Sequence, residues 1–117
     1  MKERNKTFPP FIQSHLLDIR KLCQLHKVKN LWLFGSVLRK DFSLKSDIDF
    51  LYEMDDEQIK ADEWYFSFWG FLDSLTKLLD RKIDLVWYKG IKNPYFKEEV
   101  DNSKVLLYDV KGEKIPL

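Results

Sequence analysis

The sequence predicts a single α/β (α+β) domain: a mixed β-sheet of about four strands, with helices packed mainly on one face. Two observations support this prediction. Apolar residues recur at helical spacing in some segments, and shorter segments between them show the apolar runs and alternation of strands. The chain has 117 residues, of which 44% are hydrophobic, which is typical of one globular core. Alternating helices and strands favour a layered domain.

The predicted domain occupies most of the chain. Residues 1–10 are expected to form a flexible N-terminal tail that ends at two prolines, because proline favours an extended backbone before it. Residues 11–110 form the single domain, and residues 111–117 form a C-terminal tail. No internal repeat or low-complexity segment interrupts this organisation.

The first half of the domain contains two predicted strands and a helix before them. Phe11–Lys27 has apolar residues at helical spacing. Leu31–Phe34 is an apolar run that predicts a short buried strand, and Gly35 ends it. Ser36–Phe42 is expected to form a brief helix with its serine near the N-cap. Asp47–Tyr52 predicts the second strand.

The second half alternates in the same way. Glu53–Glu57 is acidic and is expected to be a loop, and Ala61–Leu79 has the clearest helical periodicity in the chain. Lys82–Tyr88 predicts a third strand because its apolar residues alternate. Asn93–Val100 is expected to be a short helix, since proline is tolerated in a first turn. Val105–Tyr108 predicts a fourth strand.

Composition limits the function classes. The formal net charge of +1 gives no general case for binding DNA or RNA. No apolar stretch approaches the ~20 residues of a membrane span, and the basic N-terminus lacks the features of a secretory signal. The one cysteine, Cys23, cannot form an internal disulfide and is expected to be a buried helix residue. A cytoplasmic location is therefore expected.

Two carboxylates on one predicted strand carry the chemical signal. Asp47 and Asp49 are two residues apart, so in a strand they project from the same face, ~6–7 Å apart at their Cα atoms. Two carboxylates in this position repel each other unless a cation lies between them. Hard oxygen ligands suit Mg²⁺, which typically takes one or two carboxylates together with substrate phosphates; Mn²⁺ accepts the same ligands.

Two further features favour a nucleotide site. Gly35 ends a strand and Ser36 opens a helix, so their backbone N–H groups could receive an anion. Asp84 is a charged residue in the otherwise apolar strand sequence IDLVW. If that strand lies beside Asp47–Tyr52, the carboxylates converge on one patch. The alternatives for Asp84 are an ion pair with a neighbouring Arg81 or Lys82, or exposure to solvent at a sheet edge.

The spacing of these residues resembles a known family signature. Gly35-Ser36, ten intervening residues and then Asp47-Ile48-Asp49 resembles the signature of the DNA polymerase β-like nucleotidyltransferase superfamily. The run FGSVLRKDFSLKSDIDFL is similar to its minimal branch, the minimal nucleotidyltransferase (MNT) domains, in which GSxARG and SDID are common at this spacing. Leu38 and Lys40 depart from that pattern, where alanine and glycine are usual.

The resemblance implies a nucleotidyltransferase fold and a role for each matching residue. Asp47, Asp49 and Asp84 match the catalytic carboxylates that hold Mg²⁺, or Mn²⁺, with ATP as the nucleotide substrate. Asp84 also matches the carboxylate that helps to activate the attacking hydroxyl. Gly35 and Ser36 match the turn that cradles the terminal phosphates. The remaining candidate nucleotide-binding residue is Arg39, which either assists phosphate binding or braces the loop.

The resemblance also implies a partner. MNT domains of this size resemble the antitoxins of HEPN-domain ribonuclease toxins, which transfer AMP from ATP to a tyrosine of the toxin. Two alternatives remain open: a non-catalytic module that neutralises a partner by docking, and nucleotidyl transfer to a small molecule. No direct DNA binding and no membrane contact are expected.

The predicted helix Ala61–Leu79 offers a surface for such a partner. Tyr65, Phe66 and Trp69 extend beyond the apolar stripe that the core requires, and aromatic residues are favoured at interface centres. The same helix could support a homodimer. A large aromatic core cluster is the alternative explanation for these residues.

Overall fold

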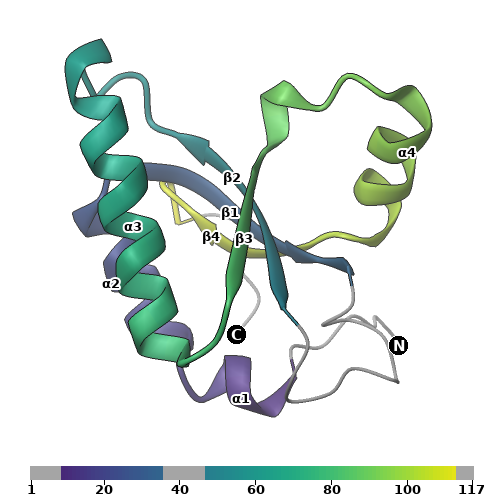
Figure 1. Cartoon of the computed structure of the whole chain (residues 1–117), viewed down its shortest axis with the longest axis horizontal. Helices are drawn as coiled ribbons and strands as arrows, with labels where there is room; N and C mark the ends of the chain where they lie inside the picture. Colours follow the sequence, from purple (N-terminus) through teal and green to yellow (C-terminus); the bar gives the residue numbers. More distant parts are fainter. Residues whose placement is uncertain (1–8, 36–46, 113–117) are drawn as a thin grey trace.

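A four-stranded mixed sheet organises the chain (Figure 1). The computed structural model describes residues 9–35 and 47–112. The sheet order is β3-β2-β1-β4. β1 runs antiparallel to β2 and to β4, whereas β2 and β3 are parallel. The mixed sheet of four strands that the sequence predicts is confirmed. The strands are β1 Val28–Phe34, β2 Ile48–Met54, β3 Ile83–Trp87 and β4 Val105–Asp109.

Four α-helices accompany the sheet in the described residues: α1 Pro10–Gln13, α2 Leu16–Leu25, α3 Trp64–Leu79 and α4 Pro94–Ser103. In Figure 1, α2 and α3 lie together at one side of the sheet and α4 lies at the other. The larger part of the core lies between the sheet and the α2–α3 layer, with Ile19, Phe50 and Leu75 fully buried. A smaller cluster of Phe34, Leu51 and Val100 lies under α4. Helices therefore cover mainly one face, as predicted.

The predicted helix over residues 11–27 is divided in two. α1 ends at Gln13 and α2 begins at Leu16. The Oγ atom of Ser14 donates a hydrogen bond to the Phe11 carbonyl at 2.9 Å, and Nδ1 of His15 lies 2.8 Å from the same oxygen. In a continuous helix that carbonyl would accept from the backbone N–H of His15. Local side-chain hydrogen bonds of this kind compete with helix formation.

Other element boundaries shift by a few residues. β2 extends to Met54, so the predicted loop begins with two strand residues. Residues Ala61–Glu63 form a 3-10 turn, η2, ahead of α3, and a second turn, η3, covers Tyr88–Gly90. α4 continues to Ser103, and the side chain of Asn93 caps its start by accepting from two backbone amides at 2.9 and 3.1 Å.

The two faces of β2 have different surroundings. Ile48, Phe50 and Tyr52 pack into the core beneath α2 and α3. Because side chains alternate along a strand, Asp49 and Leu51 project from the opposite face, and Leu51 packs with Val100 of α4. The candidate carboxylate of β2 is therefore on the side of the sheet that carries α4.

No helix within residues 9–35 and 47–112 is long and apolar enough to cross a membrane. Cys23 is fully buried on α2, as expected. Burial raises the pKa of its thiol strongly, and the nearby Arg20 opposes this only in part. The thiol is thus an inert part of the core.

Candidate active site

Asp49 and Asp84 lie side by side on neighbouring parallel strands. They are Cα partners in the β2–β3 pairing, and such strands are ~4.8 Å apart. Asp49 is half-buried and Asp84 is exposed at the sheet edge that β3 forms. Of the alternatives for Asp84, solvent exposure is therefore the one found. Its charge has no burial cost, but it stands next to a second carboxylate.

Asp47 immediately precedes β2 and has a different neighbour. Its Oδ2 atom lies 3.7 Å from Nζ of Lys82, a largely exposed residue that immediately precedes β3. The backbone N–H of Ile48 donates to the carbonyl of Lys82 at 3.1 Å, which holds the two strand starts together. Lys82 was one of the two basic residues considered as an ion-pair partner of Asp84. In the structure its ion-pair partner is Asp47.

The three carboxylates do not form one compact cluster. In the part of the chain that the structure describes, no group of three or more acidic, histidine or cysteine side chains is arranged to hold a metal ion. The register brings together Asp49 and Asp84, and Asp47 stands beside Lys82. Two adjacent carboxylates still match the donor set that Mg²⁺ uses when substrate phosphates supply further oxygens. The donor chemistry thus fits this metal.

Gly35 connects the predicted phosphate turn to these acids. It follows Phe34, which is the partner of Asp49 in the β1–β2 pairing. Its φ angle is +79°, a region that side-chain-bearing residues rarely adopt. A Cβ atom at this position would collide with the carboxylate of Asp49. A glycine is therefore required for two independent reasons. Ser36 and Arg39 lie outside the described residues, so their roles remain predictions.

The α4 side of the sheet carries a polar network that the sequence analysis missed. The Tyr88 hydroxyl donates to Asp101 at 2.6 Å, and the ammonium groups of Lys97 and Lys104 lie 3.4 and 3.0 Å from the same carboxylate. The hydrogen bond from Tyr88, followed by that from Lys104, lowers the pKa of Asp101 to about 2. The Tyr88 ring also packs on Trp32 of β1 at 5.2 Å. This network fixes α4 over the face that carries Asp49.

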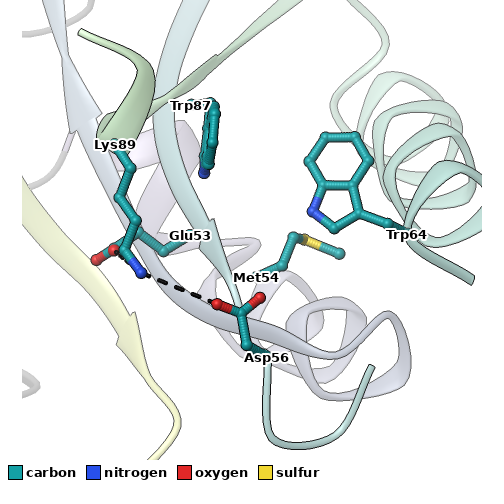
Figure 2. Close-up of a pocket in the computed structure, with 6 residues that line it drawn as sticks. All are labelled: Glu53, Met54, Asp56, Trp64, Trp87 and Lys89. Carbon is teal, nitrogen blue, oxygen red and sulfur yellow. Dashed lines mark ion pairs between the residues drawn. The ribbon is translucent and has the colours of Figure 1, made fainter. Parts of the chain in front are cut away.

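A pocket is present elsewhere, at the other end of β2 and β3 (Figure 2). It is open to solvent and includes Glu53 and Trp87 in its lining. Asp47, Asp49 and Asp84 do not line it. Shape would favour this hollow as the active site, but the paired carboxylates and the glycine turn favour the opposite strand ends. We assign the candidate active site by that chemistry.

The aromatic residues of α3 divide between core and surface. Tyr65, Phe66 and Trp69 are exposed by 62%, 75% and 50%. They contact one another, with ring centroids 5.7 Å apart for the first pair and 6.1 Å for Tyr65 and Trp69. The core-cluster explanation for these three residues is therefore wrong. α3 presents an exposed aromatic face, which we define by these residues.

Comparison with known proteins identifies the family of the chain. A family model described as polymerase beta, nucleotidyltransferase matches residues 18–113. A Methanocaldococcus jannaschii protein described as a candidate protein adenylyltransferase is 38% identical over 87 residues, which are 72% of this chain and 81% of the relative.

Solved structures share the fold. A candidate minimal nucleotidyltransferase superposes with a TM-score of 0.67 at 20% identity, covering 87% of this chain and 98% of that one. The MNT antitoxin complex with a tri-AMPylated HEPN toxin from Shewanella oneidensis gives 0.56 at 22% identity, with 85% and 73% covered. From the family match over residues 18–113, this chain is an enzyme of the polymerase beta nucleotidyltransferase family, and it has the fold of a minimal nucleotidyltransferase.

Proposed function

We propose that the protein transfers AMP from ATP to a tyrosine hydroxyl of a HEPN-domain toxin and thereby acts as its antitoxin. The observation that carries this proposal is the adjacent pair Asp49 and Asp84 beside the Gly35 turn. Support for a protein acceptor comes from the M. jannaschii relative, which is described as a candidate protein adenylyltransferase. Support for the partner class comes from the fold shared with an MNT antitoxin in complex with an AMPylated HEPN toxin.

The proposed reaction makes one bond and breaks one bond. The tyrosine oxygen forms a bond to the α-phosphorus of ATP, the bond between that phosphorus and the bridging oxygen of the β-phosphate breaks, and pyrophosphate leaves. Asp49 and Asp84 would hold Mg²⁺, with Asp47 as the further candidate ligand. When bound, the metal neutralises the charge that develops on the phosphate oxygens.

The positions of the two acids suggest different roles. Asp84 is exposed on the edge strand, so the hydroxyl of a large acceptor can reach it. We assign to its carboxylate the task of orienting that hydroxyl and receiving its proton. Asp49 is half-buried and lies against Gly35, so it is the better placed of the two to hold a metal ion beside the turn that would receive the phosphates. Ser36 and Arg39 would complete the phosphate contacts.

The exposed aromatic face of α3 is a candidate surface for the toxin. Three neighbouring exposed rings are more apolar surface than a helix needs for its own packing, and aromatic residues are enriched at interface centres. A homodimer through α3 is the second candidate use of the same face. We also propose a cytoplasmic location, because the single cysteine is buried and reduced.

The test combines the protein, α-labelled ATP, Mg²⁺ and a HEPN-domain protein encoded beside it. Label is expected on the HEPN protein with the wild type and not with Asp49→Asn. Asp18→Asn serves as the matched control, because this exposed carboxylate on α2 belongs neither to the candidate site nor to the exposed aromatic face of α3. Tight complex formation without label, together with full neutralisation by Asp49→Asn, would instead establish the docking alternative.

A further inference from the structure

The hollow of Figure 2 is a second site, separate from the carboxylates of the candidate active site. It is lined by two residues of β2, two tryptophans and two further charged residues. Glu53 stands four residues after Asp49 on β2, which places it ~13 Å away along the strand. The lining residues are Glu53, Met54, Asp56, Trp64, Trp87 and Lys89.

Two indole rings form the walls. Figure 2 shows Trp64 and Trp87 on either side of the hollow, with Met54 between them. Trp64 stacks on Phe68 with ring centroids 5.5 Å apart and planes inclined by 6°. The ring of Trp87 lies against the backbone of Gly90, where a Cβ atom would be 2.9 Å from it. Both rings are thus held by contacts within the protein, yet Trp87 remains 46% exposed.

The charges of the hollow are unequal. Nζ of Lys89 lies 3.8 Å from the carboxylate of Glu53 and 3.9 Å from that of Asp56. The ammonium of Lys89 therefore forms long ion pairs with two carboxylates. The three charged residues of the lining carry a net charge of −1. The Glu53 side chain is only 14% exposed, whereas that of Lys89 is 53% exposed. Lys89 is exposed and can be displaced, and the more shielded carboxylate of Glu53 then favours another cation beside it.

We propose that this hollow binds the guanidinium group of an arginine on a partner protein. Cations are attracted to the face of an aromatic ring within ~6 Å of its centroid, and tryptophan is the strongest such ring. A guanidinium also stacks on aromatic rings, forms paired hydrogen bonds with a carboxylate, and loses less hydration than an ammonium group. Trp64 and Trp87 supply the rings, and Glu53 supplies the carboxylate. Lys89 is the internal cation that the arginine displaces.

The hollow is continuous with the exposed aromatic face of α3. Trp64 stacks on Phe68, whose ring meets Trp69 at 5.2 Å, and Trp69 meets Tyr65 at 6.1 Å. When an arginine of the partner is bound in the hollow, the partner's neighbouring residues would contact the exposed rings of α3. Arginine, tryptophan and tyrosine are the residues that contribute most energy at protein interfaces. The partner chemistry is an exposed arginine with apolar residues beside it.

The first experiment needs neither the partner nor a nucleotide, so its result is independent of the proposed function. The probe is N-acetyl-arginine methylamide, titrated into the protein while the four tryptophan indole N–H signals are followed by NMR. The corresponding citrulline derivative is the uncharged control. We expect saturable shifts of the Trp64 and Trp87 signals with the arginine probe only. Equal shifts with citrulline, or equal shifts at Trp32, would overturn the proposal.

Variants of the hollow make the test sharper. Glu53→Gln is expected to weaken binding of the arginine probe about fivefold, and Lys89→Met is expected to tighten it because the internal competitor is gone. Asp73→Asn, which alters an exposed ion pair on α3, should leave binding unchanged. Weaker binding by Lys89→Met would contradict the displacement and overturn the proposal. Indole shifts that depend on protein concentration without any probe would assign the site to a second copy of the chain, which overturns it too.

Discussion

The carboxylates of Asp49 and Asp84 stand on neighbouring parallel strands as direct partners, and the turn glycine Gly35 leaves no space for a side chain beside Asp49. Like charges placed opposite each other destabilise a sheet. The folded protein tolerates this repulsion because Asp84 is at an exposed edge. A divalent cation between the two carboxylates would remove the repulsion, so stability and metal binding are expected to be coupled.

Asp84→Asn is predicted to raise stability without metal and to reduce the stabilisation that Mg²⁺ provides. In metal-free buffer of low ionic strength, the variant should gain about 0.2–1 kcal/mol in free energy of unfolding, because the repulsion with Asp49 is lost. Adding Mg²⁺ should raise the free energy of unfolding of the variant less than that of the wild type. A ligand stabilises the folded state according to its affinity for it, and the variant has lost one carboxylate ligand. Urea denaturation at several Mg²⁺ concentrations measures both effects. A loss of stability in metal-free buffer would show that Asp84 has a favourable structural role instead.

Gly35→Ala and Gly112→Ala form a matched pair. Both glycines have positive φ angles, +79° and +72°, so each alanine variant should lose about 1–2 kcal/mol from backbone strain. Only at Gly35 would the new Cβ meet the carboxylate of Asp49; at Gly112 nothing lies within 4 Å. Gly35→Ala should therefore also abolish stabilisation by Mg²⁺ and nucleotide transfer. Thermal unfolding with and without Mg²⁺ separates the two effects, and equal Mg²⁺ responses in the two variants would contradict the proposed contact.

Much of the fold could be predicted because its signals are local. The alternation in IDLVW placed Ile83 and Leu85 in the core and Asp84 on the opposite face, as the structure has them. The break between α1 and α2 could not be predicted from apolar spacing. The break depends on the side chains of Ser14 and His15, which form hydrogen bonds with the Phe11 carbonyl oxygen. Periodicity describes which face is buried, but not which side chains compete for backbone groups.

The candidate site was predictable in part for the same reason. Asp84 was expected to meet Asp47 and Asp49 if its strand lay beside theirs; the strands do pair, but the pairing brings only Asp49 and Asp84 opposite each other. The ion pair of Lys82 with Asp47 was not predicted, because a sequence pattern does not show the direction of a long flexible side chain. The Tyr88–Asp101 hydrogen bond was missed because it joins two elements that only the packing of α4 brings together.

Lys82→Met is predicted to increase the apparent affinity for Mg²⁺. The ammonium of Lys82 lies 3.7 Å from Asp47 and places a positive charge where a metal would otherwise be attracted. Because Lys82 is largely exposed and Asp47 is partly exposed, the increase should be modest, about two- to fivefold. Isothermal titration with Mg²⁺ in the presence of a non-hydrolysable ATP analogue measures it. A weaker Mg²⁺ affinity would mean that Lys82 acts on the nucleotide phosphates rather than as a competitor.

His26 is predicted to make stability fall in mild acid. Its ring packs near Phe71 and against Gly70 on α3, and burial lowers its pKa below the ordinary value of 6.5. The unfolded chain therefore takes up a proton more readily than the folded one. The stabilising contribution is complete above pH 6.5 and is lost as the pH falls toward the lower folded pKa. Urea midpoints at pH 7.5, 6.5 and 5.5 should fall more steeply for the wild type than for His26→Gln. If the midpoints of the two proteins fall equally with pH, His26 is not the cause of the acid sensitivity.

The Asp101 network is predicted to hold α4 in place down to strongly acidic pH. Hydrogen bonds from Tyr88 and Lys104 lower the pKa of Asp101 to about 2, below its ordinary value of 3.8. The folded state thus favours the charged carboxylate, and its contribution is present above pH 3.8 and is lost as the pH falls toward 2. Asp101→Asn and Tyr88→Phe should each increase amide hydrogen exchange in α4 at pH 6, while exchange in α2 and α3 stays the same. Asp73→Asn, which breaks an exposed pair on α3, is the control. If both network variants leave α4 exchange at the wild-type rate, the apolar contacts of Val100 with Phe34 and Leu51 are sufficient to hold the helix.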